Sequence, residues 1–345
     1  MTATPSESTA ETSLRRRRFD AYPLALLGMV ALGSLLPARG SWAGVLAVAS
    51  HLAVAGVFFL HGAKLSLQQI TLALVSWRPQ AAILLSTYLA FPLLGFGLFQ
   101  LRGARPEDAI GLGFLFLSIL PSTIQSSISF TSIARGNVAA AICGASVSNL
   151  AGVVLTPLLA ALLIGSDAGA ASPGQAAQDI ALQILLPFVL GQAARRFLAE
   201  PLRRHPRATE AFDRGSVLLV VYAAFGAGML AGVWSQISPA DLALVGLLSA
   251  VLLALVLGWT TLASRVFGFE RGDRIAVIFC GSKKSMASGI PMATALFAPH
   301  LVSVLVIPLM IFHQLQLMVC ALLARKYAAQ APDAPPPVRA APREG

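Results

Sequence analysis

Two adjacent lysines, Lys283 and Lys284, lie in the middle of an apolar stretch, residues 275–297, that is long enough to cross a membrane. A lysine at the centre of a bilayer costs about 2.5–3.5 kcal/mol on insertion scales, so a pair costs about twice as much. Charged side chains inside a membrane face a bundle interior or a wet cavity, where they mark ion, proton or solute sites. The pair therefore predicts a buried binding site that comprises Ser282, Lys283, Lys284 and Ser285.

A second polar cluster lies in another apolar stretch, residues 110–134, where a proline precedes a run of hydroxyl and amide side chains. Packing between helices explains one serine in such a place. Five hydroxyls and one amide within eight residues favour a binding site instead. The candidate ligands, which follow Pro121, are Ser122, Thr123, Gln125, Ser126, Ser127 and Ser129.

The elements that must position these residues are membrane spans. Of the 345 residues, 56% are hydrophobic and 12% are charged, whereas a soluble domain is about 25% charged. Residues 1–20 and 328–345 are expected to be disordered, and residues 21–327 to form one membrane domain. Ten apolar segments are expected at residues 22–38, 43–63, 79–101, 110–134, 138–164, 179–198, 216–235, 241–264, 275–297 and 300–324.

The distribution of Lys and Arg orients these segments. With the amino terminus in the cytosol, most basic residues fall in inside loops, as the positive-inside rule requires. Both termini are then cytosolic, and the chain lies in the plasma membrane, which is the inner membrane in bacteria. The net charge of +10 therefore reflects orientation and not nucleic-acid binding. A signal peptide is the alternative for the first segment, which lies between Arg18 and Ser41.

The two polar clusters occupy matching positions, in the fourth and ninth segments. Five spans per half, in residues 21–165 and 179–327, invert the second half relative to the first. Paired segments interrupted by Gly or Pro are typical of the binding site of a secondary transporter. The alternative for the lysine pair is a cytosolic turn, but residues 286–297 would then be too short to span. The expected break points are Pro121, Gly281, Gly289 and Pro291.

Residues 121–137 and 279–289 resemble the fourth and ninth helices of the bile acid:sodium symporter superfamily. The resemblance is greatest to the branch that contains vertebrate solute carrier family 10 member 7 and its bacterial relatives. It implies an all-α fold of ten transmembrane helices in two inverted five-helix repeats. It also implies panel and core domains, discontinuous crossing helices 4 and 9, and alternating-access transport of a small, anionic organic solute.

The chain departs from the sodium-coupled members of this superfamily. Aligned on Gly281, Phe279 and Lys283 replace a carboxylate and a glutamine that bind ions. Hydroxyls of the fifth helix are replaced by Ala141 and Ala145. We therefore do not carry over the sodium sites, and the coupling ion, proton or sodium, stays open. Polar residues near the fifth-helix positions, in a different register, are Ser146, Ser148 and Asn149.

Three roles remain open for the lysines. An ammonium could replace a bound sodium ion by binding Gln125, nearby serines and backbone carbonyls. A lysine could titrate and couple transport to protons. The pair could bind an anionic substrate directly, aided by the amino terminus of a half-helix. In the tenth segment, His313, Gln314 and Gln316 are weaker candidates, as ligands or as interhelical hydrogen-bond partners.

The sequence does not indicate an enzyme. It lacks H-E-x-x-H and an activated G-x-S-x-G elbow, and its apolar segments hold almost no Asp or Glu. We expect no cofactor and no metal, and the three cysteines lack metal-ligand spacing. The expected partners are a small organic anion and the lipid bilayer, and a homodimer is left open. The alternative function, implied by the resemblance, is a non-transporting membrane regulator of calcium homeostasis.

Overall fold

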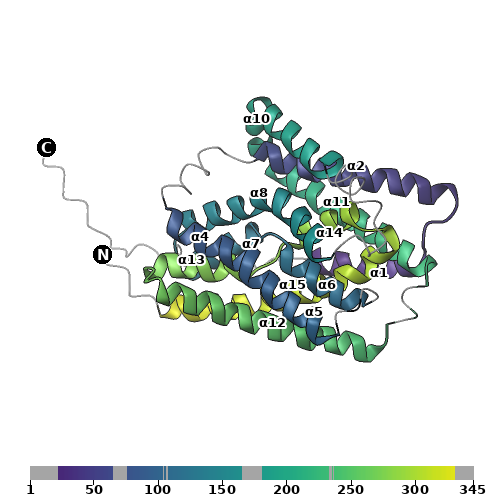
Figure 1. The fold of residues 1–345 in the computed structure, drawn as a ribbon. Helices are drawn as coiled ribbons and strands as arrows, with labels where there is room; N and C mark the ends of the chain where they lie inside the picture. The colour runs from purple at the N-terminus through teal and green to yellow at the C-terminus, as the bar shows by residue number, and fades with distance from the viewer. Residues whose placement is uncertain are drawn as a thin grey trace, which may run out of the picture.

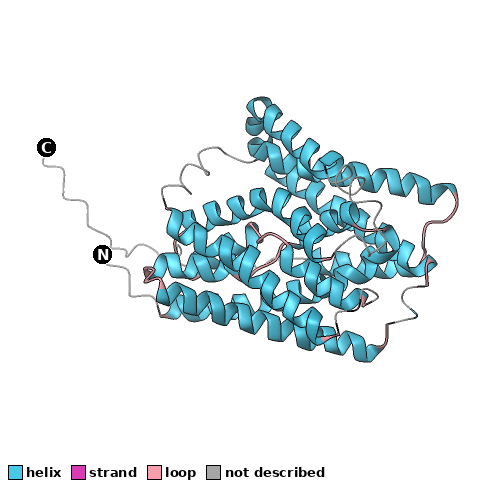
Figure 2. Cartoon of the chain, in the orientation of Figure 1, coloured by secondary structure: helices cyan, strands magenta, loops and turns pink. Residues whose placement is uncertain are grey.

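A computed structural model describes residues 22–64, 76–103, 105, 108–164, 181–232, 235 and 237–330. Within these residues the chain forms helices and connecting turns, without strands (Figure 2). The helices (Figure 1) are α1 (Tyr22–Leu35), α2 (Ser41–Lys64), α4 (Trp77–Leu85), η3 (Ser86–Ala90), α5 (Phe91–Leu101), α6 (Ala109–Ile119), α7 (Gln125–Ile133), α8 (Val138–Leu163), η4 (Ala181–Leu185), α10 (Leu186–Arg204), α11 (Pro206–Leu230), α12 (Pro239–Val266), α13 (Arg271–Gly281), α14 (Met286–Leu296) and α15 (Pro299–Ala329). The expectation of disorder for residues 1–20 lies outside the described part.

Six helices in the described part of the chain are long and apolar enough to cross a membrane: α2, the continuous run of α4, η3 and α5, and then α8, α11, α12 and α15. Shorter apolar helices occur at Leu24–Leu35 and Ala109–Ile119. This composition and length confirm a polytopic helical membrane protein. The helix α15 continues to Ala329, so the first two residues of the segment expected to be disordered, 328–345, are helical, and residues 331–345 lie outside the description.

The fourth and ninth predicted segments are each divided into two short helices. The helix α6 ends at Ile119 and α7 begins at Gln125, with Pro121 between them. The helix α13 ends at Gly281 and α14 begins at Met286, so residues 282–285 are not helical. We refer to residues 120–124 and 282–285 as the first and second breaks.

Two of the expected break points are wrong. Gly289 and Pro291 lie inside α14, which is continuous from Met286 to Leu296. The helix begins earlier because the side chain of Ser285 accepts a hydrogen bond from the backbone N–H of Ser288 and caps it. Gly289 allows α14 to pack closely against Leu120, since a Cβ atom at residue 289 would lie 2.5 Å from Leu120 Cδ1.

The breaks lie within the most deeply buried part of the bundle. Every residue of α6 from Ile110 to Ile119 is buried, and so is α13 from Ile275 to Gly281. A helix that is apolar on all sides lies in a protein core or in a membrane, and the burial of α6 and α13 places them in the core. In Figure 1, α6, α7, α13 and α15 run through the middle of the bundle, with α12 along one side.

A second group of helices packs to one side of this centre. The helix α2 lies along α10, and α1 lies along α11 (Figure 1). At the α2–α10 contact, Gly62 and Gly191 face backbone atoms of the other helix, because a Cβ atom at either glycine would collide with a carbonyl oxygen of Phe188 or Phe59. These two helices therefore touch backbone to backbone.

Residues 199–215, which separate the sixth and seventh expected segments, are largely helical. The helix α10 continues to Arg204 and α11 begins at Pro206, so His205 alone separates them. Glu200 forms ion pairs one turn away with Arg203 and Arg204. Such pairs at i and i+3 or i+4 stabilise an exposed helix, which explains how this charged stretch extends α10.

Candidate functional site

The ammonium group of Lys284, in the second break, is surrounded by backbone carbonyls. Its Nζ atom donates hydrogen bonds to Thr87 O at 2.8 Å, to Ser118 O at 2.6 Å and to Leu120 O at 2.6 Å. The side chain is fully buried, and its Nζ also lies 4.2 Å from the ring centroid of Phe91. An ammonium has three N–H donors, so all of them are used.

The neighbouring Lys283 has a different environment, although it is equally buried. Its Nζ lies 4.0 Å from the ring centroid of Phe130 and 5.5 Å from that of Phe279. Among the described residues, this Nζ has no hydrogen-bond partner. The two lysines therefore have different surroundings. The ammonium of Lys284 donates all of its hydrogen bonds to carbonyls, whereas the ammonium of Lys283 lies against the faces of two aromatic rings.

Hydroxyl groups of the first break and of α7 bind the carboxyl end of α13. The hydroxyl of Ser122 donates to Cys280 O at 2.6 Å, and that of Ser127 donates to Phe279 O at 3.0 Å. In the opposite direction, the backbone N–H of Ser285 donates to the carbonyl oxygen of Pro121 at 2.8 Å. The last carbonyls of a helix have no intrahelical donor. Each break thus supplies hydrogen-bonding groups that the other lacks.

The helix α8 holds the crossing from a third side. Ser148 Oγ accepts a hydrogen bond from the backbone N–H of Ser122 at 3.0 Å. The amide of Asn149 donates to Ser122 O at 2.7 Å and accepts from Ser288 Oγ at 3.0 Å. Two of the three secondary candidates on α8 therefore contact a break directly, while Ser146 is buried on the same helix.

The helix α15 contributes a glutamine that clamps the backbone of the second break. Gln316 Oε1 accepts from the backbone N–H of Lys284, and Gln316 Nε2 donates to Lys284 O, both at 2.9 Å. His313 Nδ1 lies 2.8 Å from Gln316 Nε2. The His313–Gln316 contact lies within α15, so the bond between helices is the one from Gln316 to the second break. Gln314 is half-buried nearby on the same helix.

The remaining candidates bond to one another or to their own helix, or are exposed. The hydroxyl of Thr123 lies 2.7 Å from that of Ser126 and 3.0 Å from that of Ser127. Ser282 Oγ donates to a carbonyl of its own helix at 2.6 Å. Gln125 and Ser129 are exposed on α7. Of the partners expected for an ammonium, Gln125 and serine hydroxyls are wrong for Lys284, whereas backbone carbonyls are correct, because its three acceptors are all carbonyl oxygens.

Sequence reasoning missed the contribution of the third predicted segment. Thr87 supplies a carbonyl to Lys284, and Tyr88 donates its hydroxyl to Ser148 O at 2.6 Å. The polar triplet of residues 86–88, inside an apolar segment, was a usable signal. The π-helix η3 that aims these groups has no recognisable sequence pattern. Thr156 was also missed, and its hydroxyl donates to Ile119 O at 2.8 Å.

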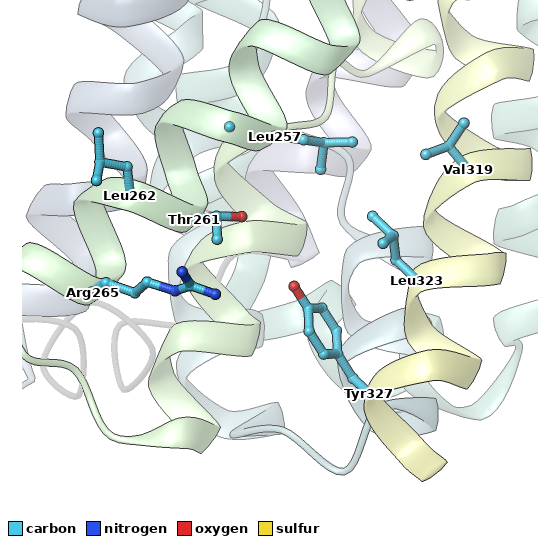
Figure 3. A pocket seen from close by; sticks show the side chains of 8 residues that line it. Leu257, Thr261, Leu262, Arg265, Val319, Leu323 and Tyr327 are labelled. Atoms are coloured by element: carbon cyan, nitrogen blue, oxygen red, sulfur yellow. The ribbon is translucent and has the colours of Figure 1, made fainter. Parts of the chain in front are cut away.

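An apolar groove of about 420 Å³ lies between α12 and α15, away from the breaks. Figure 3 shows the side chains of Arg265 and Tyr327 directed toward one another from these two helices. The ring of Tyr327 lies 6.1 Å from the ring of Phe279, which in turn faces Lys283. The rings of Tyr327 and Phe279 thus lie between the groove and Lys283. Its lining is Leu257, Gly258, Thr261, Leu262, Arg265, Val319, Leu323 and Tyr327.

The ligand chemistry of the crossing follows from these groups. The hydrogen-bonding atoms at the breaks are carbonyls, hydroxyls, amides and two ammonium groups. Within the described residues, no three His, Cys, Asp or Glu side chains gather where they could hold a metal ion. The arrangement is suited to binding inside a membrane, where irregular backbone survives only if protein or a wet cavity satisfies it.

Comparisons with known proteins agree with this architecture. A Pseudomonas aeruginosa protein named "Uncharacterized protein PA2026" is 46% identical over 325 residues, which cover 93% of this chain and 97% of that protein. The Escherichia coli (strain K12) protein named "Putative symporter YfeH" is 42% identical over 314 residues, which cover 91% and 94%. The Xenopus tropicalis protein named "Sodium/bile acid cotransporter 7" is 27% identical over 326 residues, which cover 90% and 92%.

The family comparison covers the whole of the expected membrane domain, residues 21–327. The model of the SBF-like CPA transporter family matches residues 20–329. This match and the named relatives confirm the branch that residues 121–137 and 279–289 indicate. The chain is an integral membrane transporter, and it belongs to the SBF-like CPA transporter family.

Proposed function

We propose that this transporter carries a small organic anion by alternating access and that Lys283 provides the positive charge that binds it. The observation that carries the proposal is the environment of Lys283. Its ammonium is fully buried beside the crossing of two broken helices, and it has no hydrogen-bond partner in the described part of the chain. A carboxylate, sulfonate or phosphate on a solute would supply the missing partner.

The energies favour an anionic ligand. A lysine at the bilayer centre costs about 2.5–3.5 kcal/mol. Contact with aromatic faces recovers up to about 2 kcal/mol when the cation is desolvated, and Phe130 and Phe279 provide that contact. The remaining cost is removed when an anion pairs with the ammonium. The cost therefore acts as a bias toward the solute-bound state.

The inverted ten-helix fold is the second part of the proposal. The turn after α7 lies against the start of α13, since Asn137 N donates to Gly272 O at 3.0 Å and Asn137 Nδ2 donates to Asp273 Oδ1 at 2.7 Å. The two broken segments therefore run in opposite directions, as inverted repeats at residues 21–165 and 179–327 require. We assign α1, α2, α10 and α11 to a panel domain and the remaining helices to a core domain.

Sodium coupling is not expected in this scheme. Phe279 and Lys283 occupy the positions at which sodium-coupled members place a carboxylate and a glutamine. An ammonium at such a position repels a second cation and supplies no oxygen ligand. A proton gradient or the solute gradient alone then drives transport. The orientation that accompanies this scheme places both termini in the cytosol and the chain in a bacterial inner membrane.

A thermal-shift screen of the purified protein tests the proposal. Carboxylates, sulfonates and phosphates of varied size are added to the wild type, once in sodium buffer and once in choline buffer of equal ionic strength. We expect at least one anion to raise the midpoint of thermal unfolding, Tm, equally in both buffers. The stabilising anion is then tested for counterflow in proteoliposomes.

Two lysine variants make this screen specific. Lys283→Met removes the charge and keeps the length of the side chain, and Lys326→Met makes the same change at an exposed site at the end of α15. Only Lys283→Met should abolish the thermal shift and the counterflow. Counterflow by Lys283→Met at the wild-type rate would refute the role of Lys283. Stabilisation that requires sodium would refute the proposal that transport is independent of sodium.

A further inference from the structure

The carbonyl oxygen of Thr87 has no N–H donor within its own helix. In the π-helix η3, the backbone N–H of Phe91 donates to Ser86 O. The next N–H along the chain would belong to residue 92, which is a proline and has none. The carbonyl of Thr87 is therefore left without a helical partner, in a buried part of the bundle where it needs one.

The carbonyl oxygens at the end of α6 are in the same condition. Pro121 has no N–H, and the N–H of Ser122 is directed away, to Ser148 Oγ. Ser118 O thus loses both of the donors that a continuing helix would supply. Leu120 lies just after the last helical residue, where carbonyls have no intrahelical donor. Together, two prolines and one helix end expose three carbonyl oxygens at one point.

These oxygens form a suitable environment for a small cation. All three lie 2.6–2.8 Å from a single position, which Lys284 Nζ occupies. The carboxyl end of α6 adds the partial negative charge of a helix dipole. The ring of Phe91, 4.2 Å from the same position, presents its negative face. Rings of backbone carbonyls replace the hydration shell of monovalent cations in channel filters by the same means.

We infer that Thr87 O, Ser118 O and Leu120 O form a monovalent-cation site that Lys284 fills permanently from within the chain. The tethered ammonium connects the third segment, α6 and the second break, so the crossing keeps its geometry without a free alkali-metal ion. The lysines then have separate roles, because Lys284 completes the folded structure, whereas the ammonium of Lys283 has no hydrogen-bond partner among the described residues. This inference concerns the folded protein itself, and it holds whether or not an organic anion is the solute.

The test is chemical rescue of a variant that empties the site. Lys284→Ala removes the equivalent of n-propylammonium and leaves the carbonyls in place. The Tm of purified Lys284→Ala is measured in choline chloride, and again with n-propylammonium, ammonium or potassium replacing choline at equal ionic strength. We expect the Tm in choline to be lower than that of the wild type by about 5 °C or more, and n-propylammonium to restore most of the loss.

Matched variants separate this site from general salt effects. Lys284→Met fills the same space with an apolar chain, so it should lose stability without recovering in any cation. Lys283→Ala, next in the chain but without carbonyl partners, should show no cation dependence. The inference is overturned if Lys284→Ala does not respond to the amine, or if Lys284→Met or Lys283→Ala responds equally.

A second measurement covers the case in which Lys284→Ala does not fold in choline. The variant is then expressed and purified with n-propylammonium throughout, and the yield of monodisperse protein should depend on that amine. The wild type is measured in parallel in sodium, potassium and choline chloride, where its Tm should be the same. A wild-type Tm that requires sodium or potassium would show that the lysine does not fill the cation site.

Discussion

Replacement of Asn149 by leucine should loosen both breaks at once. This residue lies on α8 and bonds to Ser122 O at 2.7 Å and to Ser288 Oγ at 3.0 Å. Its third hydrogen bond, to Ala145 O at 2.9 Å, is to its own helix. Leucine has nearly the same size but cannot hydrogen bond, so Ser122 O loses its donor and Ser288 Oγ its acceptor.

The expected loss of stability follows from the two bonds that join different segments. Interhelical hydrogen bonds in a membrane protein contribute about 0.6 kcal/mol each on average and about 1.7 kcal/mol at most. Two such bonds therefore correspond to about 1.2–3.4 kcal/mol. The bond to Ala145 O adds little, because that carbonyl belongs to a regular stretch of α8. At about 2 °C per kcal/mol for a chain of this size, the corresponding decrease in Tm is about 2–7 °C.

The cysteines of the chain provide the assay. Cys143, Cys280 and Cys320 are free and buried, so a thiol-reactive fluorogenic dye reports unfolding without any added label. Hydrogen exchange measured by mass spectrometry then locates the change. We expect faster exchange in Asn149→Leu at residues 120–124 and 285–289, and unchanged exchange in α2 and α10.

The control is Ser146→Ala, a change of a buried polar residue on the same helix that bonds to neither break. Its Tm should stay within about 1 °C of the wild type. Equal Tm values for the two variants would refute the claim that Asn149 holds the crossing. Uniformly faster exchange in Asn149→Leu would refute it as well, because it would indicate general destabilisation.

Two further pairs of substitutions use the same thermal assay. Gly191→Ala should lower stability by about 1–3 kcal/mol because its methyl group would collide with the backbone of α2, whereas Gly215→Ala, which meets no atom within 4 Å, should be neutral or stabilising. A loss of equal size in both would contradict the proposed contact. Thr156→Val should cost about 1 kcal/mol because Ile119 O loses its donor, and Thr260→Val should cost less because that hydroxyl bonds to its own helix. The reverse order would show that Ile119 O does not depend on the hydroxyl.

The sequence was sufficient to locate the crossing but not its internal contacts. Charge and polarity in apolar segments are costly in a membrane, so Lys283, Lys284 and the hydroxyls that follow Pro121 were visible as exceptions. Pro121 marked the first break because proline has no backbone N–H to donate within a helix. The second break was placed correctly at Gly281, but Gly289 and Pro291 were read as breaks although Ser285 starts a helix before them.

The partners of the lysines depend on tertiary structure and had no local signal. Lys284 binds carbonyls, and every residue has a carbonyl, so side-chain identity does not reveal which ones will lack donors. Recognition of Thr87 required knowing that Phe91 donates to Ser86 O in a π-helical turn. The stretch around His205 lay outside the expected segments because it is highly charged. It is helical because Glu200 pairs with Arg203 and Arg204 one turn away.

The contact between α2 and α10 has a consequence for motion. Helices separated by long side chains can slide or rotate, because the side chains change rotamer as the backbones move. At Gly62 and Gly191 no side chain lies between the backbones, and a small rotation would drive a carbonyl oxygen of Phe59 or Phe188 into the opposite chain. The pair must therefore move as one rigid body. A conformational change of the protein has to occur at those helix contacts where side chains of ordinary size separate the backbones.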